Sequence, residues 1–511
     1  MPLAALDYAL AGAGAFLLYK FATRPDGRPL PPGPKRLPLI GNLLDMPQSH
    51  AWKTFAKWGE EYGDIVSVDL LGTRFVIINN PDAAVDLLNK RARNTSDRPS
   101  FPMANDLVGW DQTISNLRSE GTHKEYRKLV GRIIGTRNHV SKFDATSELQ
   151  ATLFLRRLLE SHNDVEQAIR TTALALILAL VYGYKVKESQ GVIDDPVVAL
   201  ADQVLAEFGD VTRPGAHLVD VFPILEYVPA WFPGAGFQKK ALRHKANLTS
   251  FIEMPWDFVK KSVAAGEDNN SYAANLLREG DLSEQRIHEI KWSAGSFYAA
   301  GSDTTVSIIL NYFLAACKYP EVQKKAQAEI DAVIGTDRLP SLNDRPNLPY
   351  VEALVSELYR WLPVAPLALP HRAVNDDVYN GVLIPKDATI FANVWWFFHN
   401  EANYKDAYTF NPERFLGPNP ERNPREIGAF GFGRRSCPGE HLAEVSVWIS
   451  VTKAIAAFHI EKALDAQGNP IEPIADSMDG IISRPYAFAC VAKPRSEQVV
   501  HIIDEDIARL S

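Results

Sequence analysis

The stretch from Ser283 to Lys318 restricts the fold of this chain more than any other segment. Its apolar residues recur three and four positions apart, which is the spacing of one face of an α-helix. An average helix of a globular protein has only about three turns. We therefore expect one unusually long helix that crosses the core of a single large domain.

Helical periodicity also dominates other segments, whereas strand-like alternation is confined to short ones. Pro320 stands at a first-turn position and Gly335 follows a last turn, as helix ends favour. These patterns predict a mainly α fold with a small β region. The further expected helices are 148–161, 165–184, 320–334 and 348–362, and the expected strands are 65–69, 75–79 and 388–392.

The composition is that of a globular protein, with 46% hydrophobic and 23% charged residues among 511. No repeat or low-complexity tract separates Pro34 from Ala492. The formal charge of -8 and the lack of a long basic run argue against a nucleic acid partner. Cys317, Cys437 and Cys490 are too few for a disulfide framework and suit a reducing compartment.

The N-terminus predicts a transmembrane anchor at residues 3–19, which are apolar except for Asp7. A helix of that length spans roughly 25 Å, slightly less than the hydrocarbon layer. Basic residues follow from Lys20 on, which favours a cytosolic position for the rest of the chain. A cleaved signal peptide is the alternative, although no basic residue precedes the apolar run.

Three further parts complete the predicted organisation. Residues 20–38 form a proline-rich hinge, because prolines favour a stiff extended spacer. Residues 39–495 form the globular domain, and residues 496–511 form a polar C-terminal tail. The apolar and aromatic run 227–234 is suited to dip into a bilayer surface, and a core loop is its equal alternative.

The segment around Cys437 carries the candidate chemistry. Residues 430–439 read Phe-Gly-Phe-Gly-Arg-Arg-Ser-Cys-Pro-Gly, a loop that leads into the helical pattern of residues 440–458. A helix dipole and backbone N–H groups would stabilise a thiolate there. Gly433 and Gly439 would let the backbone lie against a flat ligand. Taken alone, such a cysteine is more often a buried structural thiol.

The whole pattern resembles the haem-binding signature of the cytochrome P450 family, Phe-x-x-Gly-x-Arg-x-Cys-x-Gly. The fixed positions are matched at Phe430, Gly433, Arg435, Cys437 and Gly439. The resemblance implies the cytochrome P450 fold, with one haem domain after an N-terminal anchor. It also implies that Cys437 is the axial ligand of haem b iron, with Phe430 and the two glycines beside the cofactor.

Residues 300–304, Ala-Gly-Ser-Asp-Thr, resemble the oxygen-activating helix of the same family. Splitting dioxygen needs protons delivered to one of its oxygens while other water is kept out. The resemblance implies that Asp303 passes protons inward and that Thr304 donates a hydrogen bond to the oxygen. A kinked helix with hydroxyls bonded to the preceding turn is the alternative. Because this run is poor helix interior, we expect a reason other than packing for it.

Two more groups of residues follow from the resemblance. Glu357 and Arg360 lie three apart on an expected helix and can pair, and the family joins such a pair to an arginine of a Pro-Glu-Arg-Phe segment, here Arg414. These three residues are therefore expected to be structural. The family's propionate contacts correspond to Arg127, His371 and Arg435. Many members have Trp where this chain has His123, which we expect on a helix surface.

The family's substrate pocket lies over the distal haem face and corresponds here to mostly apolar segments. Each candidate could equally be plain core. The candidate lining residues are Met103, Leu107, Trp110, Phe297, Val364, Leu367 and Ile481.

The resemblance implies a monooxygenase that hydroxylates a lipophilic small molecule with one atom of O2. Secondary-metabolite biosynthesis is the expected field, with terpenoid, polyketide and alkaloid scaffolds all open. The chain has no flavin or nicotinamide fingerprint, so electrons are expected from NADPH through a separate NADPH-cytochrome P450 reductase, with cytochrome b5 as a second donor. The expected location is the endoplasmic reticulum membrane, single-pass, with a cytosolic catalytic domain.

Two other function classes compete with this one. A haem-thiolate isomerase or dehydratase would not need the Asp303 and Thr304 relay. A haem sensor or carrier would be expected to supply a second axial ligand, and residues 297–304 contain no His or Met.

Overall fold

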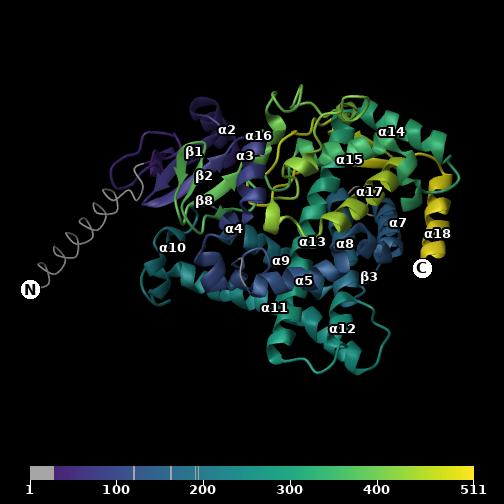
Figure 1. Ribbon diagram of the computed structural model, residues 1–511. Helices are drawn as coiled ribbons and strands as arrows, with labels where there is room; N and C mark the ends of the chain where they lie inside the picture. The colour runs from purple at the N-terminus through teal and green to yellow at the C-terminus, as the bar shows by residue number, and fades with distance from the viewer. Residues whose placement is uncertain (1–27, 119–120, 161–163, 190–191, 194, 214) are drawn as a thin grey trace, which may run out of the picture. The chain divides into compact units, whose positions relative to one another are not determined.

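The computed structural model describes residues 28–118, 121–160, 164–189, 192–193, 195–213 and 215–511. The expected anchor at 3–19 and the first part of the hinge lie outside these residues. The described chain is mainly helical with small sheets, which confirms the predicted fold class (Figure 1).

Contacts divide the chain into two compact units. Among the described residues, unit 1 contains residues up to Pro99, Leu367–Phe397 and Phe432–Arg434. Unit 2 contains Ser100–Pro366, Phe398–Gly431 and Arg435–Ser511.

Unit 1 is built on a four-stranded sheet with the order β1-β2-β8-β5. β2 and β8 are parallel, and the other two pairs are antiparallel. Val66, Val68 and Ile77 of this sheet pack against Phe55 and Trp58 of helix α2. The elements are β1 (Ile65–Leu70), β2 (Thr73–Ile78), β5 (His371–Arg372), β6 (Asp377–Tyr379), β7 (Val382–Ile384), β8 (Thr389–Ala392), η1 (Leu43–Asp45), α2 (Ala51–Tyr62), α3 (Pro81–Ala84), η2 (Val85–Lys90) and α4 (Ala92–Thr95).

The described part of the hinge is bound along β1. The carbonyl oxygens of Pro31 and Pro32 accept hydrogen bonds from the Ser67 Oγ and Ser67 N, at 2.7 and 2.9 Å. Gly33 approaches so closely that a Cβ there would lie 2.3 Å from the Ser67 carbonyl oxygen. The chain from Pro31 to Pro34 is non-helical, and a side chain at position 33 would push it off the strand.

Unit 2 is helical, with the short ladders β3–β4 and β9–β10. Its helices are α5 (Thr122–Ile134), α6 (Arg137–Val140), α7 (Asp144–Glu160), α8 (Val165–Tyr182), α9 (Pro196–Val211), α10 (Leu218–Val221), α11 (Gly236–Ala264), α12 (Tyr272–Leu277), α13 (Glu284–Lys318), α14 (Pro320–Val333), α15 (Pro349–Trp361), α17 (Glu440–Ala457) and α18 (Gln498–Leu510). Its strands are β3 (Glu188–Ser189), β4 (Val192–Ile193), β9 (Phe458–Lys462) and β10 (Cys490–Pro494).

Several short helical turns complete the described elements. These turns are η3 (Met103–Val108), η4 (Trp110–Gln112), η5 (Ser141–Phe143), η6 (Pro223–Tyr227), η7 (Leu342–Asn347), η8 (Pro412–Phe415), η9 (Pro424–Ile427) and η10 (Gly433–Arg435). Helix α16 (Val394–His399) ends in Phe398 and His399, which belong to unit 2.

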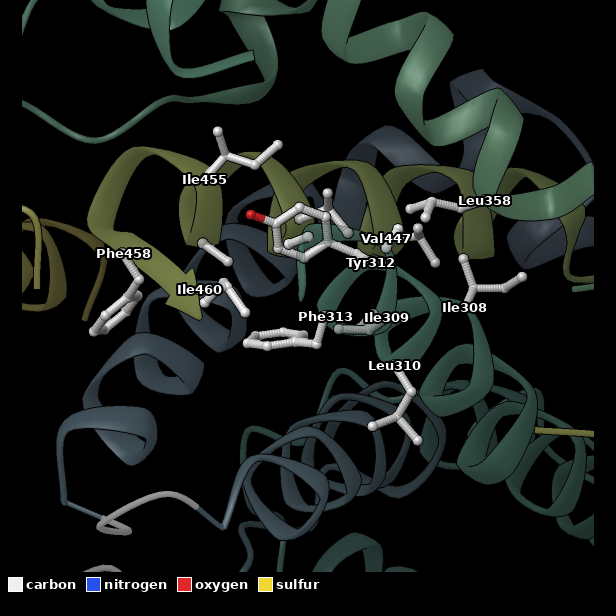
Figure 2. Packing of buried hydrophobic residues seen from close by; sticks show 14 of the residues in the cluster. Ile308, Ile309, Leu310, Tyr312, Phe313, Leu358, Val447, Ile455, Phe458 and Ile460 are labelled. Carbon is white, nitrogen blue, oxygen red and sulfur yellow. The ribbon is translucent and has the colours of Figure 1, made fainter. Parts of the chain in front are cut away.

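Helix α13 is the long helix expected from the sequence. The Ser283 side chain caps its first turn by accepting from Arg286 N at 3.2 Å, and the helix ends at Lys318. It contributes residues to both large apolar clusters of unit 2. Figure 2 shows its C-terminal half, with Ile308, Ile309 and Tyr312 lying near residues of α15, α17 and β9. The predicted crossing of the core is therefore observed within unit 2.

Packing explains part of the unusual middle of α13, contrary to our expectation. A Cβ at Gly301 would lie 2.5 Å from Ile177 Cδ1 of α8, so the glycine permits close contact between the two helices. Among the described residues, α8 is also the one helix long and apolar enough to span a membrane, and 78% of its span is buried inside the protein. We interpret α8 as a core helix.

The C-terminal residues treated as a polar tail contain helix α18. Val499 and Ile503 are buried, and Asp506 accepts a hydrogen bond from Lys453 Nζ of α17 at 2.7 Å. Val499 and Ile503 are four positions apart, so they lie on the same face of α18, and this face is buried.

Candidate active site

The Cys437 loop has a defined backbone geometry. The Cys437 N–H donates to the Phe430 carbonyl at 2.7 Å, which closes the loop. Gly431 and Gly433 have φ values of +74° and +52°, which favour glycine. A Cβ at Gly433 would also lie 2.3 Å from the Leu88 carbonyl oxygen. This protein contact, and not only a ligand, requires a glycine at position 433.

Cys437 has a free thiol. Its side chain is exposed, yet burial raises the pKa of the thiol. The Gly439 N–H, which hydrogen bonds to the sulfur, and the charge of Arg127 lower that pKa, while Glu440 raises it. Because the residue is exposed, its thiol is accessible to a ligand. A bound metal cation would supply the positive charge that a thiolate needs there.

Arg127, which is half-buried, and Arg435, which is buried, provide positive charge near this loop. Arg127 Nη1 of α5 donates to the Ser436 carbonyl at 2.8 Å, and among the described residues no carboxylate pairs with it. Burial lowers the pKa of Arg127, while Cys437 raises it. Arg435 is buried and donates to the carbonyls of Ile114 and Leu117. A buried guanidinium held by carbonyls suits the carboxylate of a ligand.

His371 lies in unit 1, on β5. It is 2% exposed, and its Nδ1 lies 2.6 Å from the Thr95 carbonyl oxygen. Arg98, which no sequence pattern singled out, is a buried cation of the same unit and donates to the Leu369 and Pro370 carbonyls at 2.8 and 2.6 Å. Nothing in the spacing around Arg98 separated it from a surface arginine.

His123 is buried, so its expected position on a helix surface is wrong. It shares the inward face of α5 with Tyr126 and Val130, which are also buried. His123, Tyr126 and Val130 follow one another at intervals of three and four residues, which is the spacing of one helix face. Because His123 is polar, it did not look like part of an apolar face in the sequence.

Thr304 lies in an uninterrupted part of α13. Its hydroxyl donates to the Ala300 carbonyl at 2.8 Å, and the Ser302 hydroxyl donates to the Tyr298 carbonyl at 2.6 Å. Both hydroxyls therefore bond to the preceding turn, as the alternative interpretation of residues 300–304 expects. Such a bond occupies the Thr304 proton and leaves its oxygen able to accept another hydrogen bond.

Asp303 takes part in a network of charges. Its Oδ1 lies 3.6 Å from Arg170 Nη1 of α8 and 3.9 Å from Arg484 Nη1. Arg170 also contacts Glu166 and Asp202, at 3.1 and 3.6 Å. Burial raises the pKa of Asp303, Arg170 lowers it, and Asp202 and Glu166 raise it. Neither arginine could be tied to Asp303 from the sequence, because only the fold brings these segments together.

The expected structural group is assembled in unit 2. Arg360 donates to both Glu357 oxygens at 2.6 and 2.7 Å, and Arg414 Nε donates to Glu357 Oε1 at 3.1 Å. Glu357 and Arg360 are completely buried. Arg360 Nη1 also donates to the Phe398 and Ala407 carbonyls at 2.7 and 2.6 Å. The group is shielded from solvent and ties α15 to the segment that contains η8.

The candidate pocket residues belong to different clusters. Met103, Leu107, Trp110 and Phe297 share one apolar cluster of unit 2, where Trp110 and Phe208 have ring centroids 4.4 Å apart. Val364 packs against the other large cluster of that unit, and Ile481 is half-buried. Leu367 packs against the clusters of unit 1. Of the seven candidates, Met103, Leu107, Trp110 and Phe297 therefore lie in the same apolar cluster.

Comparison with known proteins places the chain in a family. The family model described as Cytochrome P450 matches residues 31–487. The chain is 46% identical over 484 residues to cytochrome P450 monooxygenase 208 of Postia placenta, covering 94% of this chain and 93% of the relative. It is 38% identical over 506 residues to cytochrome P450 monooxygenase claR of Ampulloclitocybe clavipes, with 98% and 93% covered. It is 36% identical over 500 residues to the multifunctional cytochrome P450 monooxygenase af510 of Aspergillus fumigatus, with 96% and 92% covered. The match over most of its length shows that this chain is a monooxygenase of the cytochrome P450 family.

Proposed function

We propose that this monooxygenase hydroxylates a lipophilic secondary metabolite, with a terpenoid, polyketide or alkaloid scaffold. The free, exposed Cys437 thiol, in a loop that matches the family's haem-binding signature, is the observation that carries this proposal. Haem held there would supply the iron that binds and reductively splits dioxygen. Electrons would come from NADPH through a separate reductase.

The residues present fit a haem. Cys437 would be the iron ligand, with the Gly439 N–H stabilising its thiolate. Arg127, Arg435 and His371 would bind the two propionates. Phe430, whose ring centroid lies 5.1 Å from that of Tyr359, would hold the loop in place.

Asp303 and Thr304 would handle protons. The pKa of Asp303 is raised because burial outweighs the opposing charge of Arg170, and a raised pKa favours the protonated form that can donate a proton. Thr304 would accept from the solvent side and donate inward by turning away from Ala300. The buried bodies of Met103, Trp110 and Phe297 would limit water at the substrate side.

A membrane location is part of the proposal. The segment from α10 to residue 232 exposes large apolar side chains, with Leu218 at 69%, Ile224 at 72%, Tyr227 at 75% and Trp231 at 79%. This exposure favours contact with a bilayer over a core loop for residues 227–234. Together with an anchor at residues 3–19, it supports a single-pass protein of the endoplasmic reticulum with a cytosolic catalytic domain.

Spectroscopy tests the proposal. Purified ferric protein would be titrated with terpenes, polyketides and indole alkaloids while the Soret band is followed. A shift toward high spin would identify the substrate class, and turnover with NADPH and a reductase should then give a hydroxylated product. Cys437→Ala should abolish the red-shifted band of the reduced carbon monoxide complex. If that band persisted in the variant, Cys437 would not be the iron ligand.

A further inference from the structure

We propose that Arg425 is a positioning residue that raises the reduction potential of a haem iron held by Cys437. It would act through the Glu440 carboxylate, whose charge it neutralises at the start of α17. This inference rests on the haem site proposed above. The step concerned is the reduction of ferric to ferrous iron by a single electron from the reductase, in which no bond of the chain forms or breaks.

Cys437 and Glu440 lie at the same helix end. Gly439 caps α17, Glu440 is the first residue of the helix, and Cys437 comes three residues before Glu440. A Cβ at Gly439 would lie 3.8 Å from the Cys437 sulfur, so the thiol lies beside this helix start. The N–H groups and the dipole of a helix start stabilise negative charge. A thiolate and the Glu440 carboxylate therefore share one positive end, and their like charges repel each other.

Arg425 brings a positive charge to this carboxylate. From η9, its Nη2 and Nε donate to Glu440 Oε1 at 2.8 and 3.1 Å, and its Nη1 lies 3.0 Å from Glu444 Oε1. The side chains of Arg425 and Glu440 are each only 28% exposed, and that of Glu444 is 17% exposed. Solvent therefore screens this group less than it screens an ion pair on the open surface.

The same guanidinium contacts the loop that contains Cys437. Arg425 Cζ lies 5.9 Å from the centroid of the Phe430 ring, within the range of a cation–π interaction. The Phe430 ring also lies 5.1 Å from the Tyr359 ring, and the Phe430 carbonyl accepts from the Cys437 N–H at 2.7 Å. Arg425 therefore connects the start of α17 to the residue that closes the Cys437 loop.

Charge beside the thiolate acts on the iron potential. Reduction adds a negative charge at the iron, so a nearby anion opposes it and a nearby cation favours it. With Arg425 in place, the charge of Glu440 is largely cancelled. Without Arg425, the carboxylate remains beside the thiolate, and the ferrous form becomes less stable relative to the ferric form.

Arg345 provides a matched comparison within the same group of charges. Its Nη2 donates to Glu444 Oε1 at 2.7 Å, and its Nε donates to Glu352 Oε2 at 2.8 Å. In the described part of the chain, no hydrogen bond or ion pair joins Arg345 to Glu440. Both arginines thus bind the Glu444 carboxylate, and a purely structural role predicts similar effects when either one is removed.

The test is a redox titration of the full-length, haem-loaded protein. The red-shifted band of the reduced carbon monoxide complex first establishes that each variant holds haem through the thiolate. Arg425→Gln should then have a more negative potential, so that the ferrous fraction at a fixed applied potential falls several-fold. Arg425→Lys keeps the charge and should stay close to the wild type, and Arg345→Gln should shift the potential less than Arg425→Gln. An unchanged potential in Arg425→Gln, or equal shifts in the two glutamine variants, would overturn the proposal.

The carboxylate gives an independent test, which holds even if Arg425→Gln fails to fold. Glu440→Gln removes negative charge and should have a more positive potential than the wild type. Glu440→Gln combined with Arg425→Gln should return close to the wild-type value. If the potential of Glu440→Gln were unchanged, the route through this carboxylate would be wrong. Normal carbon monoxide bands with unmoved potentials would contradict this inference alone, whereas a wild type without that band would contradict the proposed haem site.

Discussion

Arg170 Nη1 lies 3.6 Å from Asp303 Oδ1, and this contact joins α8 to the middle of α13. Arg170 is only 14% exposed, and it also holds Glu166 and Asp202. The Asp303 carboxylate, which we propose handles protons, is thus kept beside a cation that favours its ionised form, against the burial that opposes it. The balance between the two sets the pH range in which Asp303 can exchange protons.

Removing this cation should move the pH dependence of the reaction. In Arg170→Gln, the pKa of Asp303 rises further, because burial is left without its main opponent. The carboxylate then stays protonated up to a higher pH, so the alkaline limb of the profile of product formed per NADPH should shift upward. Arg132→Gln, which removes an exposed pair with Glu279, should leave the profile unchanged. If the pH profile of Arg170→Gln were unshifted, Arg170 would have no influence on proton transfer through Asp303.

Thr304→Ala should uncouple oxygen consumption from product formation. The variant loses the one hydroxyl that we place inward of Asp303, so NADPH and O2 should be consumed while hydrogen peroxide is released. The fold should be little affected, because the hydroxyl bonds only to the Ala300 carbonyl of its own helix. Thr304→Ser keeps a hydroxyl and should retain most of the coupling. Thr305→Ala is the neighbouring control, and equal coupling in both alanine variants would dismiss the role of Thr304.

Much of this site could be predicted because its signals are local. The Cys437 loop and the limits of α13 are encoded by glycines, prolines and apolar spacing within a few turns, and the structure has them where expected. The partners of Asp303 could not be predicted, because Arg170 and Arg484 become its neighbours only through packing of distant segments. His123 was misplaced because a polar residue on an inward face looks like a surface residue when its partners are unknown.

Glu357→Gln should prevent haem incorporation by weakening the core of unit 2. The substitution leaves Arg360 and Arg414 buried without their shared carboxylate, at a cost of about 3–5 kcal/mol. We expect low yield, a lower unfolding temperature and a reduced Soret band for each protein molecule. Glu413→Gln removes a carboxylate with a 54% exposed side chain from the adjacent turn, and should change stability by less than about 0.5 kcal/mol. Wild-type stability in Glu357→Gln would show that the group is dispensable.

The Lys453 and Asp506 pair makes α18 part of the folded unit. Lys453 is completely buried on α17, and its Nζ donates to Asp506 Oδ2 and Thr152 Oγ1, both at 2.7 Å. In Asp506→Asn the ammonium loses its charged partner, which should cost about 3–5 kcal/mol. Lys453→Met combined with Asp506→Leu should recover much of that loss, because neither charge then remains buried.

The pH dependence of stability gives a second measure of this pair. Burial raises the pKa of Asp506, but the hydrogen bond and charge of Lys453 outweigh it, so the pKa is lowered. A carboxylate with a lowered folded-state pKa stabilises the fold above its unfolded value of about 3.9, and this contribution disappears as the pH falls through the folded value. Denaturant unfolding of the wild type should therefore show stability lost on the acid side, and the double variant should lose less of it. Equal acid sensitivity in the two proteins would mean that other carboxylates dominate, and that α18 is held by Val499 and Ile503 alone.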